Sequence, residues 1–251
     1  MGFFTALRFL TVLPLPPGRE KGSKEVGRSL LYFPLVGLLL GLLLAGLDWA
    51  LGHVLPISLC SGVLLVFLVL ITGATHLDGF IDTCDGLVAG KTPQQRWEIM
   101  RDSRVGAFGV VGACCLFLLM YVSLAGLPES SRIGALMLMP VLGRWSVVCS
   151  IFAFPYARPE GLGRAFKDQA TWLTVAVATI VALAASLGLL RLTGLAIMFG
   201  VGLVTLALSL ILKRKFAGLT GDAYGAIIEV GEVTSLILAI ALLKAMPSWN
   251  W

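Results

Sequence analysis

Charged residues are scarce in this sequence of 251 residues. Asp, Glu, Lys and Arg together make up 13% of the chain, whereas apolar residues make up 58%. Because soluble domains carry about 25% charged residues, this composition excludes an ordinary soluble domain. The mean hydropathy of +0.94 predicts an integral membrane protein instead.

Several common motifs are also missing. The five cysteines lie in or beside apolar runs without a paired metal-binding spacing, so we interpret them as reduced packing residues. No P-loop, dinucleotide fingerprint, HExxH zinc motif or GxSxG nucleophile turn occurs, and the acids do not follow the spacing of an EF-hand. No cleavable signal peptide, soluble domain or internal repeat is apparent. We therefore expect residues 1–251 to form a single transmembrane domain.

Apolar runs of about 20 residues, the length that crosses a bilayer as a helix, recur along the chain. They predict an all-α, polytopic bundle in the lipid bilayer with about seven transmembrane helices. The expected spans are 30–51, 54–74, 106–125, 132–154, 171–190, 194–212 and 225–243.

The distribution of Lys and Arg predicts how this bundle is oriented. With a cytoplasmic N-terminus, fifteen of the nineteen basic residues fall in cytoplasmic segments, and Arg132, Arg191 and Lys244 fall outside. This asymmetry is typical of multi-pass proteins of the inner (plasma) membrane. It also accounts for the net charge of +5, so no nucleic-acid partner is expected.

Two cytoplasmic segments are distinctive. Residues 1–29 form an N-terminal segment that begins either with a short interfacial helix, whose apolar face includes Phe3 and Leu7, or with a disordered tail. Residues 75–105 form the longest polar stretch and the main candidate for an active-site loop. Within it, Thr92 and Pro93 predict the start of a helix, as N-cap and first helical residue.

Three aspartates at the start of this loop are the strongest functional signal. Asp78, Asp82 and Asp85 are spaced i, i+4 and i+7, so on a helix they project from one face. Mg²⁺ is usually held by one or two carboxylates together with substrate phosphates. The spacing therefore predicts a magnesium site that faces the cytoplasm; the alternative is a solvated helix end.

Further polar residues occur on the same predicted side. Arg101, Ser103 and Arg104 precede a span and are candidates for binding phosphate, or are ordinary cytoplasmic residues. Asp102 and Asp222 are candidates to join the metal site.

Other polar residues lie within or beside the spans. Glu229 shares a helical face with Asp222, and Glu232 lies one turn deeper near that face. Acids at that depth usually line a functional cavity; the alternative is that they are neutralised and hydrogen-bonded between helices. His76 either contacts phosphate, acts as a base, or caps or packs a helix. Arg144, within a span, pairs with Glu232 or binds a substrate phosphate.

These motifs resemble a known family. Residues 76–86 (HLDGFIDTCDG) and 98–106 (EIMRDSRVG) closely resemble cobalamin synthase, the adenosylcobinamide-GDP ribazoletransferase family. Residues 9–16 (FLTVLPLP), 156–163 (YARPEGLG) and the stretch from Thr220 to Glu232 are similar to the same family. The resemblance runs nearly from end to end.

The resemblance implies a Mg²⁺-dependent phosphotransferase near the end of vitamin B12 biosynthesis. A ribose hydroxyl of α-ribazole, or of α-ribazole 5′-phosphate, attacks the cobinamide-linked phosphorus of adenosylcobinamide-GDP. GMP leaves, and adenosylcobalamin or its 5′-phosphate is formed. On this hypothesis the aspartates hold Mg²⁺, Arg101 and Arg104 bind the diphosphate, and Glu229, Glu232 or His76 accepts the hydroxyl proton.

Two other classes of membrane protein also carry clustered acids. A CDP-alcohol phosphatidyltransferase requires a DGxxAR pattern, but Asp78-Gly79 is followed by Phe80-Ile81-Asp82. A cation transporter would carry acids through the depth of the bilayer, whereas here most of them gather on one side. The sequence leaves open whether the chain forms a homo-oligomer.

Overall fold

The computed structural model describes residues 2–14 and 23–245. Arg19 and Lys21, counted above as cytoplasmic, and Leu15 and Pro16 of the family-like stretch lie outside the described residues. Within the described ranges the regular structure is helical, apart from an isolated β-bridge between Tyr156 and Leu219. The helices are α1 (Gly2–Leu10), α2 (Ser23–Arg28), α3 (Phe33–Gly52), α4 (Ile57–Ile71), α5 (Thr75–Ala89), α6 (Pro93–Ile99), α7 (Ala107–Gly126), α8 (Glu129–Ala153), α9 (Leu162–Gln169), α10 (Trp172–Phe216) and α11 (Gly221–Ala245).

The expectation of a polytopic helical membrane protein is confirmed. By length and composition, 5 of the described helical segments are long and apolar enough to cross a membrane, or 6 if the bent pair α4–α5 counts as one span. These two helices meet at an angle of 90°, at a corner where Gly73 and Ala74 adopt left-handed backbone angles. The number seven therefore stays a prediction.

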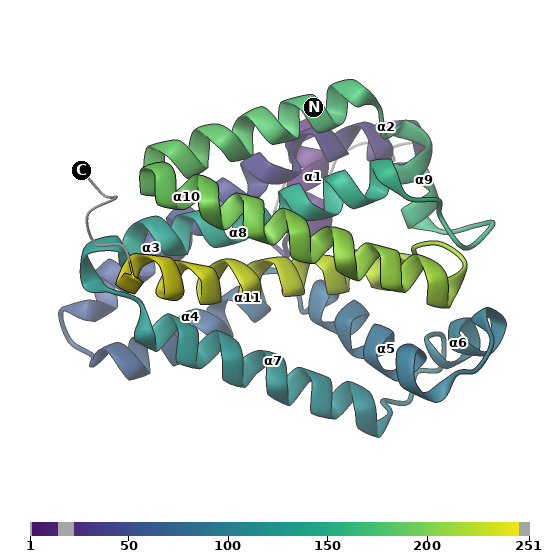
Figure 1. Ribbon diagram of the computed structural model, residues 1–251, viewed down its shortest axis with the longest axis horizontal. Helices are drawn as coiled ribbons and strands as arrows, with labels where there is room; N and C mark the ends of the chain where they lie inside the picture. The colour runs from purple at the N-terminus through teal and green to yellow at the C-terminus, as the bar shows by residue number, and fades with distance from the viewer. Residues whose placement is uncertain (1, 15–22, 246–251) are drawn as a thin grey trace.

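Helix α10 explains part of the difference between the seven expected spans and the 5 or 6 candidate spans of the structure. It contains a break at Arg191, where φ is 53° and ψ is −135°, and its two halves lie side by side in Figure 1. A Cβ atom on Gly194 would lie 2.1 Å from the carbonyl oxygen of Ser186, so only glycine fits this reversal. The two halves correspond to the expected spans 171–190 and 194–212.

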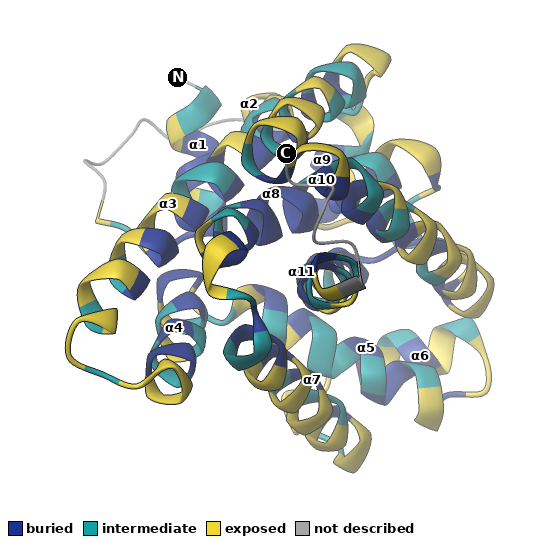
Figure 2. Cartoon of the chain, turned by 60° about the vertical axis from the view of Figure 1, so that its left-hand side comes forward, coloured by how far each residue is buried: buried dark blue, intermediate teal, exposed yellow. Residues whose placement is uncertain are grey.

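Helix α11 lies in the middle of the bundle, and the other long helices surround it (Figure 2). It packs against α5, α7, α8 and α10. The outer faces of α7 and α10 expose large apolar side chains such as Val111, Leu118, Ile180 and Phe199. In water such a surface would be unstable, and in a bilayer it faces lipid.

The bundle has two chemically different ends, both visible in Figure 1. At one end, which we call the acidic end, the later part of α5, together with α6 and α9, lies near the first turn of α11. At the opposite end, α3 is followed by α4, and α7 by α8.

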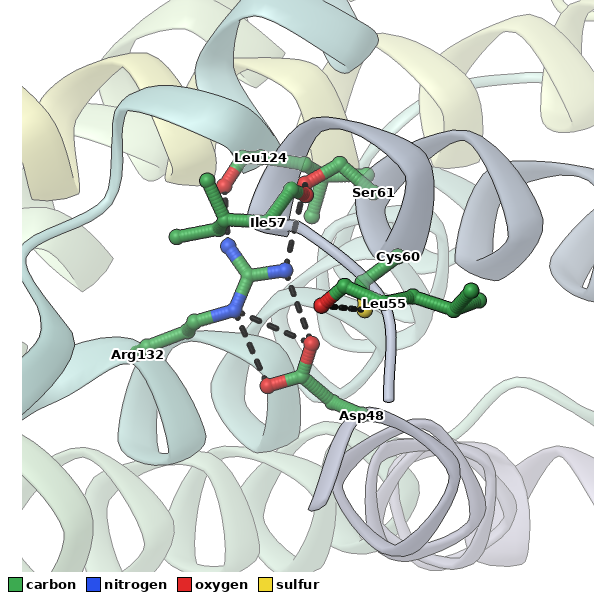
Figure 3. Close-up of polar contacts among 7 residues, drawn as sticks. All are labelled: Asp48, Leu55, Ile57, Cys60, Ser61, Leu124 and Arg132. Carbon is green, nitrogen blue, oxygen red and sulfur yellow. Dashed lines mark hydrogen bonds and ion pairs between the residues drawn. The ribbon is translucent and has the colours of Figure 1, made fainter. Parts of the chain in front are cut away.

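A buried ion pair stabilises the opposite end. There the guanidinium of Arg132 donates to both carboxylate oxygens of Asp48 at 2.8–3.0 Å and to the hydroxyl of Ser61 at 3.1 Å (Figure 3). It also donates to the Leu124 carbonyl. One arginine, expected outside the membrane, thus ties α3, α4 and α7 to α8.

The short helices cover the acidic end. The capping box at Thr92 and Gln95 begins α6 as expected, with Pro93 in its first turn. The buried Arg96 of α6 donates to the carbonyls of Gly86 and Leu87 near the end of α5, where a cation complements the helix dipole. The predicted active-site loop 75–105 is thus mostly two packed helices.

The N-terminal segment forms a helix, but its apolar face packs on protein. In α1, Leu7 and Leu10 are buried in the core formed with α3, α8 and α9. Phe3 contacts Tyr32 edge to face at 6.3 Å, whereas Phe4 is 55% exposed. The structure thus shows the helical alternative for this segment, but most of its apolar face covers the bundle, and its place at the membrane interface stays a prediction.

Candidate active site

The acidic end is organised by the close crossing of α5 and α11. A Cβ atom on Gly79 would lie 2.8 Å from the carbonyl oxygen of Asp222, and one on Gly225 would lie 2.8 Å from that of His76. Only glycines allow two helix backbones to approach this closely. The crossing brings Asp78, which precedes Gly79, beside Asp222, although 144 positions separate them in the sequence.

Three carboxylates gather at this crossing. Asp78 is exposed, Asp82 is half-buried, and the side chain of Asp222 is 25% exposed. Asp82 is repelled electrostatically by Asp78, by Asp222 and by Asp85, and Asp222 is repelled by Asp78. Repulsion among carboxylates favours binding of a cation.

Arg158 is the nearest compensating cation. Its guanidinium donates to Asp222 at 3.0 Å, and its side chain is only 13% exposed. The Nε atom of Arg158 is buried without a hydrogen-bond partner among the described residues. A guanidinium with a spare donor beside carboxylates is suited to binding a phosphate oxygen.

The backbone holds Arg158 in place through two paired loops. The amide of Ala157 donates to the Leu219 carbonyl and the amide of Leu219 donates to the Pro155 carbonyl, each at 2.8 Å. Gly218, with φ of 142°, packs directly on Ala157. Arg158 was not among the predicted site residues, although it lies in the family-like stretch 156–163.

Asp85 occupies a different position from its two neighbours. It is buried, and its carboxylate accepts hydrogen bonds from the amides of Gly106 and Gly109 at 2.9 and 2.8 Å. These amides belong to the N-terminus of α7, where helix amides can bind an anion such as a substrate phosphate. Asp85 itself occupies this position, so these amides are not free to bind the substrate.

The glycines of α7 fit this arrangement. A Cβ atom on Gly106 would lie 2.3 Å from the Asp85 carboxylate, and one on Gly109 would lie 2.5 Å from it. The family-like stretches 76–86 and 98–106 therefore contact each other through the Asp85 side chain and Gly106, and Gly109 just beyond the second stretch completes the contact.

The loop after α6 is exposed. Arg104 donates to both carboxylate oxygens of Asp102, the shortest contact being 2.7 Å. This hydrogen bond lowers the pKa of the Asp102 carboxyl to about 2. Ser103 is exposed beside them, and Arg101 acts electrostatically on Tyr156 at the edge of the site.

Arg144 of α8 and Glu232 of α11 form an ion pair inside the bundle. Arg144 is 0% exposed and its guanidinium donates to the carboxylate of Glu232, which is 1% exposed. Of the two alternatives for Arg144, the structure shows the ion pair with Glu232. Glu229 interacts electrostatically with the same arginine. These three residues and His76 line a small cavity of about 10 Å³, room for about one water molecule.

A larger cavity lies next to the carboxylates. It has a volume of about 240 Å³, and its walls come from α1, α3, α5, α8, α9 and α11. Asp78 and Asp222 line it together with His76, which therefore lies between the two cavities. The Nε2 atom of His76 is buried without a hydrogen-bond partner among the described residues.

The carboxylates at the acidic end can hold a metal ion only together with ligands from outside the protein. Among the described residues, no group of three or more His, Cys, Asp or Glu side chains is arranged to hold a metal ion. The carboxylates of Asp78, Asp82 and Asp222 lie close enough to repel one another. They fit Mg²⁺ in its usual mode, in which one or two carboxylates act together with phosphate oxygens and water.

Comparisons with known proteins agree with the motifs. The family described as cobalamin-5-phosphate synthase matches residues 2–240. A protein of Geotalea daltonii named adenosylcobinamide-GDP ribazoletransferase is 38% identical over 240 residues, which cover 96% of this chain and 97% of the relative. Proteins with the same name from Desulforamulus reducens and Desulfitobacterium hafniense are each 39% identical, over 94% and 95% of this chain and 94% and 96% of theirs.

No solved structure matches. The family match nevertheless extends through every motif of the acidic end, from the aspartates of α5 to the loop that carries Arg158 and the first turns of α11. The chain belongs to the cobalamin-5-phosphate synthase family of transferases.

Proposed function

We propose that this protein joins adenosylcobinamide-GDP to α-ribazole or α-ribazole 5′-phosphate, a late step of cobalamin biosynthesis. The products are GMP and adenosylcobalamin or its 5′-phosphate. Three carboxylates and a partly unsatisfied arginine beside a cavity carry this proposal, because they suit a diphosphate substrate. The relatives named above carry the matching activity in their names.

The reaction is a substitution at phosphorus. A ribose hydroxyl oxygen of the acceptor forms a bond to the cobinamide-linked phosphorus, and the bond from that phosphorus to the bridging oxygen breaks. GMP leaves with this oxygen, and the hydroxyl proton passes to a base. Such transfers depend mainly on positioning and on neutralising charge.

Asp78, Asp82 and Asp222 are the proposed magnesium ligands. Mg²⁺, when bound, supplies positive charge that neutralises the diphosphate. Asp85 is excluded from the set because it caps α7, and Asp102 because Arg104 holds it at the surface. Asp222 also has a partner, Arg158, but this arginine lies within the proposed site and can share the substrate phosphate.

Arg158 binds the diphosphate next to these carboxylates, and Arg101 approaches from the adjoining loop. Of the proposed bases, His76 is favoured because it lines the cavity and has a free ring nitrogen. Glu232 is already paired with Arg144, and Glu229 lies near the same arginine. Arg144 therefore has a structural role in this proposal.

The acidic end faces the cytoplasm in this proposal, with the protein in the inner membrane and the N-terminus cytoplasmic. The basic residues of α6, α9 and the end of α10 lie at this end, as the positive-inside rule requires. The nucleotide substrate would then reach the carboxylates from the cytoplasm.

A direct assay tests the function. The purified protein in detergent is incubated with adenosylcobinamide-GDP, α-ribazole and Mg²⁺, and GMP and cobalamin are measured by mass-resolved chromatography. We expect equal amounts of both products and their loss on addition of EDTA. Absence of product from folded protein, with either α-ribazole or its 5′-phosphate, would overturn the proposed function.

A further inference from the structure

The cavity beside Asp78 and Asp222 has a different character from the carboxylates at its edge. Most of its wall is apolar, and the buried side chains of Val147 and Ile151 from α8 and Ile228 from α11 contribute to it. The exposed Leu162, at the start of α9, also lines it. One side of the cavity is thus suited to an apolar group and the other to a cation or phosphate.

Aromatic rings form another part of the wall. Phe9 of α1, Phe33 of α3 and Phe166 of α9 line the cavity and contact one another. Phe9 and Phe166 meet edge to face at 4.7 Å, Phe33 and Phe166 at 5.4 Å, and Phe9 and Phe33 are stacked at 6.0 Å. Such a cluster favours a flat aromatic ligand, which can stack or make edge contacts.

A second polar group in the wall, besides the Nε2 atom of His76, has no partner among the described residues. Tyr224 lines the cavity, is 6% exposed, and its hydroxyl has no hydrogen-bond partner among the described residues. A buried hydroxyl without a partner is unfavourable, and a ligand atom that accepts its hydrogen bond removes the penalty. The wall thus matches an aromatic group that carries one acceptor.

We propose that this cavity binds the aromatic base of the acceptor and thereby selects which base is incorporated. This inference rests on the proposed function. The bicyclic base of α-ribazole, a dimethylbenzimidazole, has an apolar outer edge and one free ring nitrogen, which accepts the hydrogen bond of Tyr224. Guanine, the other base of the reaction, carries an amide and an amino group, and the apolar wall leaves these unpaired.

The position of the cavity fits the reaction. Its polar edge is formed by Asp78 and Asp222, so a ribose attached to a base in the cavity lies towards the carboxylates. The hydroxyl that attacks phosphorus is then held at the proposed metal site. In this arrangement α1 and α9 form walls of the acceptor site, which explains why the apolar face of α1 packs inward.

The Tyr224 contact is tested with a pair of acceptors. We compare kcat/KM for benzimidazole riboside and for indole riboside, which lacks the free ring nitrogen, in the wild type and in Tyr224→Phe. We expect Tyr224→Phe to lower kcat/KM at least about fivefold for the benzimidazole acceptor only. Tyr121→Phe, which removes a hydroxyl from the outer face of α7, is the matched control and should alter neither value.

The size of the cavity is tested with Val147→Phe, which fills it. This variant should lower kcat/KM for α-ribazole by about tenfold or more, while an acceptor with a monocyclic imidazole loses much less and the KM for adenosylcobinamide-GDP is unchanged. Val122→Phe on the lipid-facing side of α7 is the control. Equal losses for all acceptors, or a rise only in the KM for adenosylcobinamide-GDP, would overturn the inference.

Failure of the inference is distinguishable from failure of the proposed function. If the wild type turns over but Tyr224→Phe and Val147→Phe leave base selectivity unchanged, only the base site is wrong. Isothermal titration with α-ribazole alone provides a measurement without turnover. Binding to the wild type that weakens in Val147→Phe supports the cavity, and unchanged binding contradicts it.

Discussion

Gly79 of α5 lies against the backbone of Asp222 of α11, so close that a single added carbon would meet the Asp222 carbonyl oxygen at 2.8 Å. This contact sets the distance between the two helices that carry the proposed metal ligands. A glycine next to an acid in the sequence thus controls how that acid meets another one far along the chain.

Gly79→Ala should therefore impair activity more than folding. The added methyl group forces α5 and α11 apart and separates Asp78 from Asp222, so we expect turnover to fall at least about tenfold, the loss that about 1.4 kcal/mol of transition-state stabilisation gives. Gly46→Ala in α3 is the control, because a Cβ there meets nothing within 4 Å. Product formation and thermal unfolding in detergent measure both effects; wild-type turnover in Gly79→Ala would contradict the role of the crossing.

Asp82→Asn should reduce turnover strongly while the protein still inserts and folds. The substitution keeps the size of the side chain but removes a charge from the proposed magnesium site, so we expect a loss of about 100-fold or more, which corresponds to about 2.7 kcal/mol. The Mg²⁺ concentration needed for half-maximal rate should rise. Asp102→Asn in the exposed loop should change neither quantity. Retained activity in Asp82→Asn would eliminate its role in metal binding.

Arg158→Ala should weaken binding of the diphosphate substrate. A charge-assisted hydrogen bond contributes about 1.5–3 kcal/mol, so the KM for adenosylcobinamide-GDP should rise about tenfold or more, with little change in the KM for α-ribazole. Arg164→Ala is the matched control, since Arg164 pairs with Asp168 on the surface of α9. An equal rise in the KM for adenosylcobinamide-GDP in both variants would show that Arg158 acts only through the net charge of this surface and not through a direct contact.

Asp85→Ala should destabilise the protein through α7. Two amides lose their acceptor, and loss of a helix cap costs about 0.5–2 kcal/mol. We expect a lower thermal unfolding temperature in detergent, with a smaller decrease for Asp85→Asn, whose amide oxygen still accepts one bond. A variant with unchanged stability but altered Mg²⁺ dependence would instead return Asp85 to the metal site.

Arg144→Met should be among the most destabilising single changes. It leaves Glu232 buried without its partner, which costs about 3–5 kcal/mol in a protein interior. Adding Glu232→Gln should recover part of the loss, because the remaining side chain is then neutral. Unfolding of the two variants and the wild type is compared in the same detergent. If the double variant is less stable than Arg144→Met alone, the two residues do not act as an ion pair.

Some features were predictable because they depend on local sequence. The scarcity of charge and the long apolar runs required a helical membrane bundle, since a backbone in lipid must satisfy its own hydrogen bonds. The cap at Thr92 and the short N-terminal helix were also predictable, because capping and helical periodicity act within a few residues. The i, i+4 spacing placed Asp78 and Asp82 together for the same reason.

The partners of these residues depended on contacts between distant segments. Helical spacing put Asp85 on the same face as Asp78 and Asp82, but packing against α7 turned its carboxylate to the amides of Gly106 and Gly109. The tertiary structure likewise paired Arg144 with Glu232 and brought Arg158 to Asp222. By itself the sequence determined which side chains share a face of one helix. Only the packing of other helices against that face decided whether each side chain caps a neighbour, forms an ion pair or remains available to a ligand.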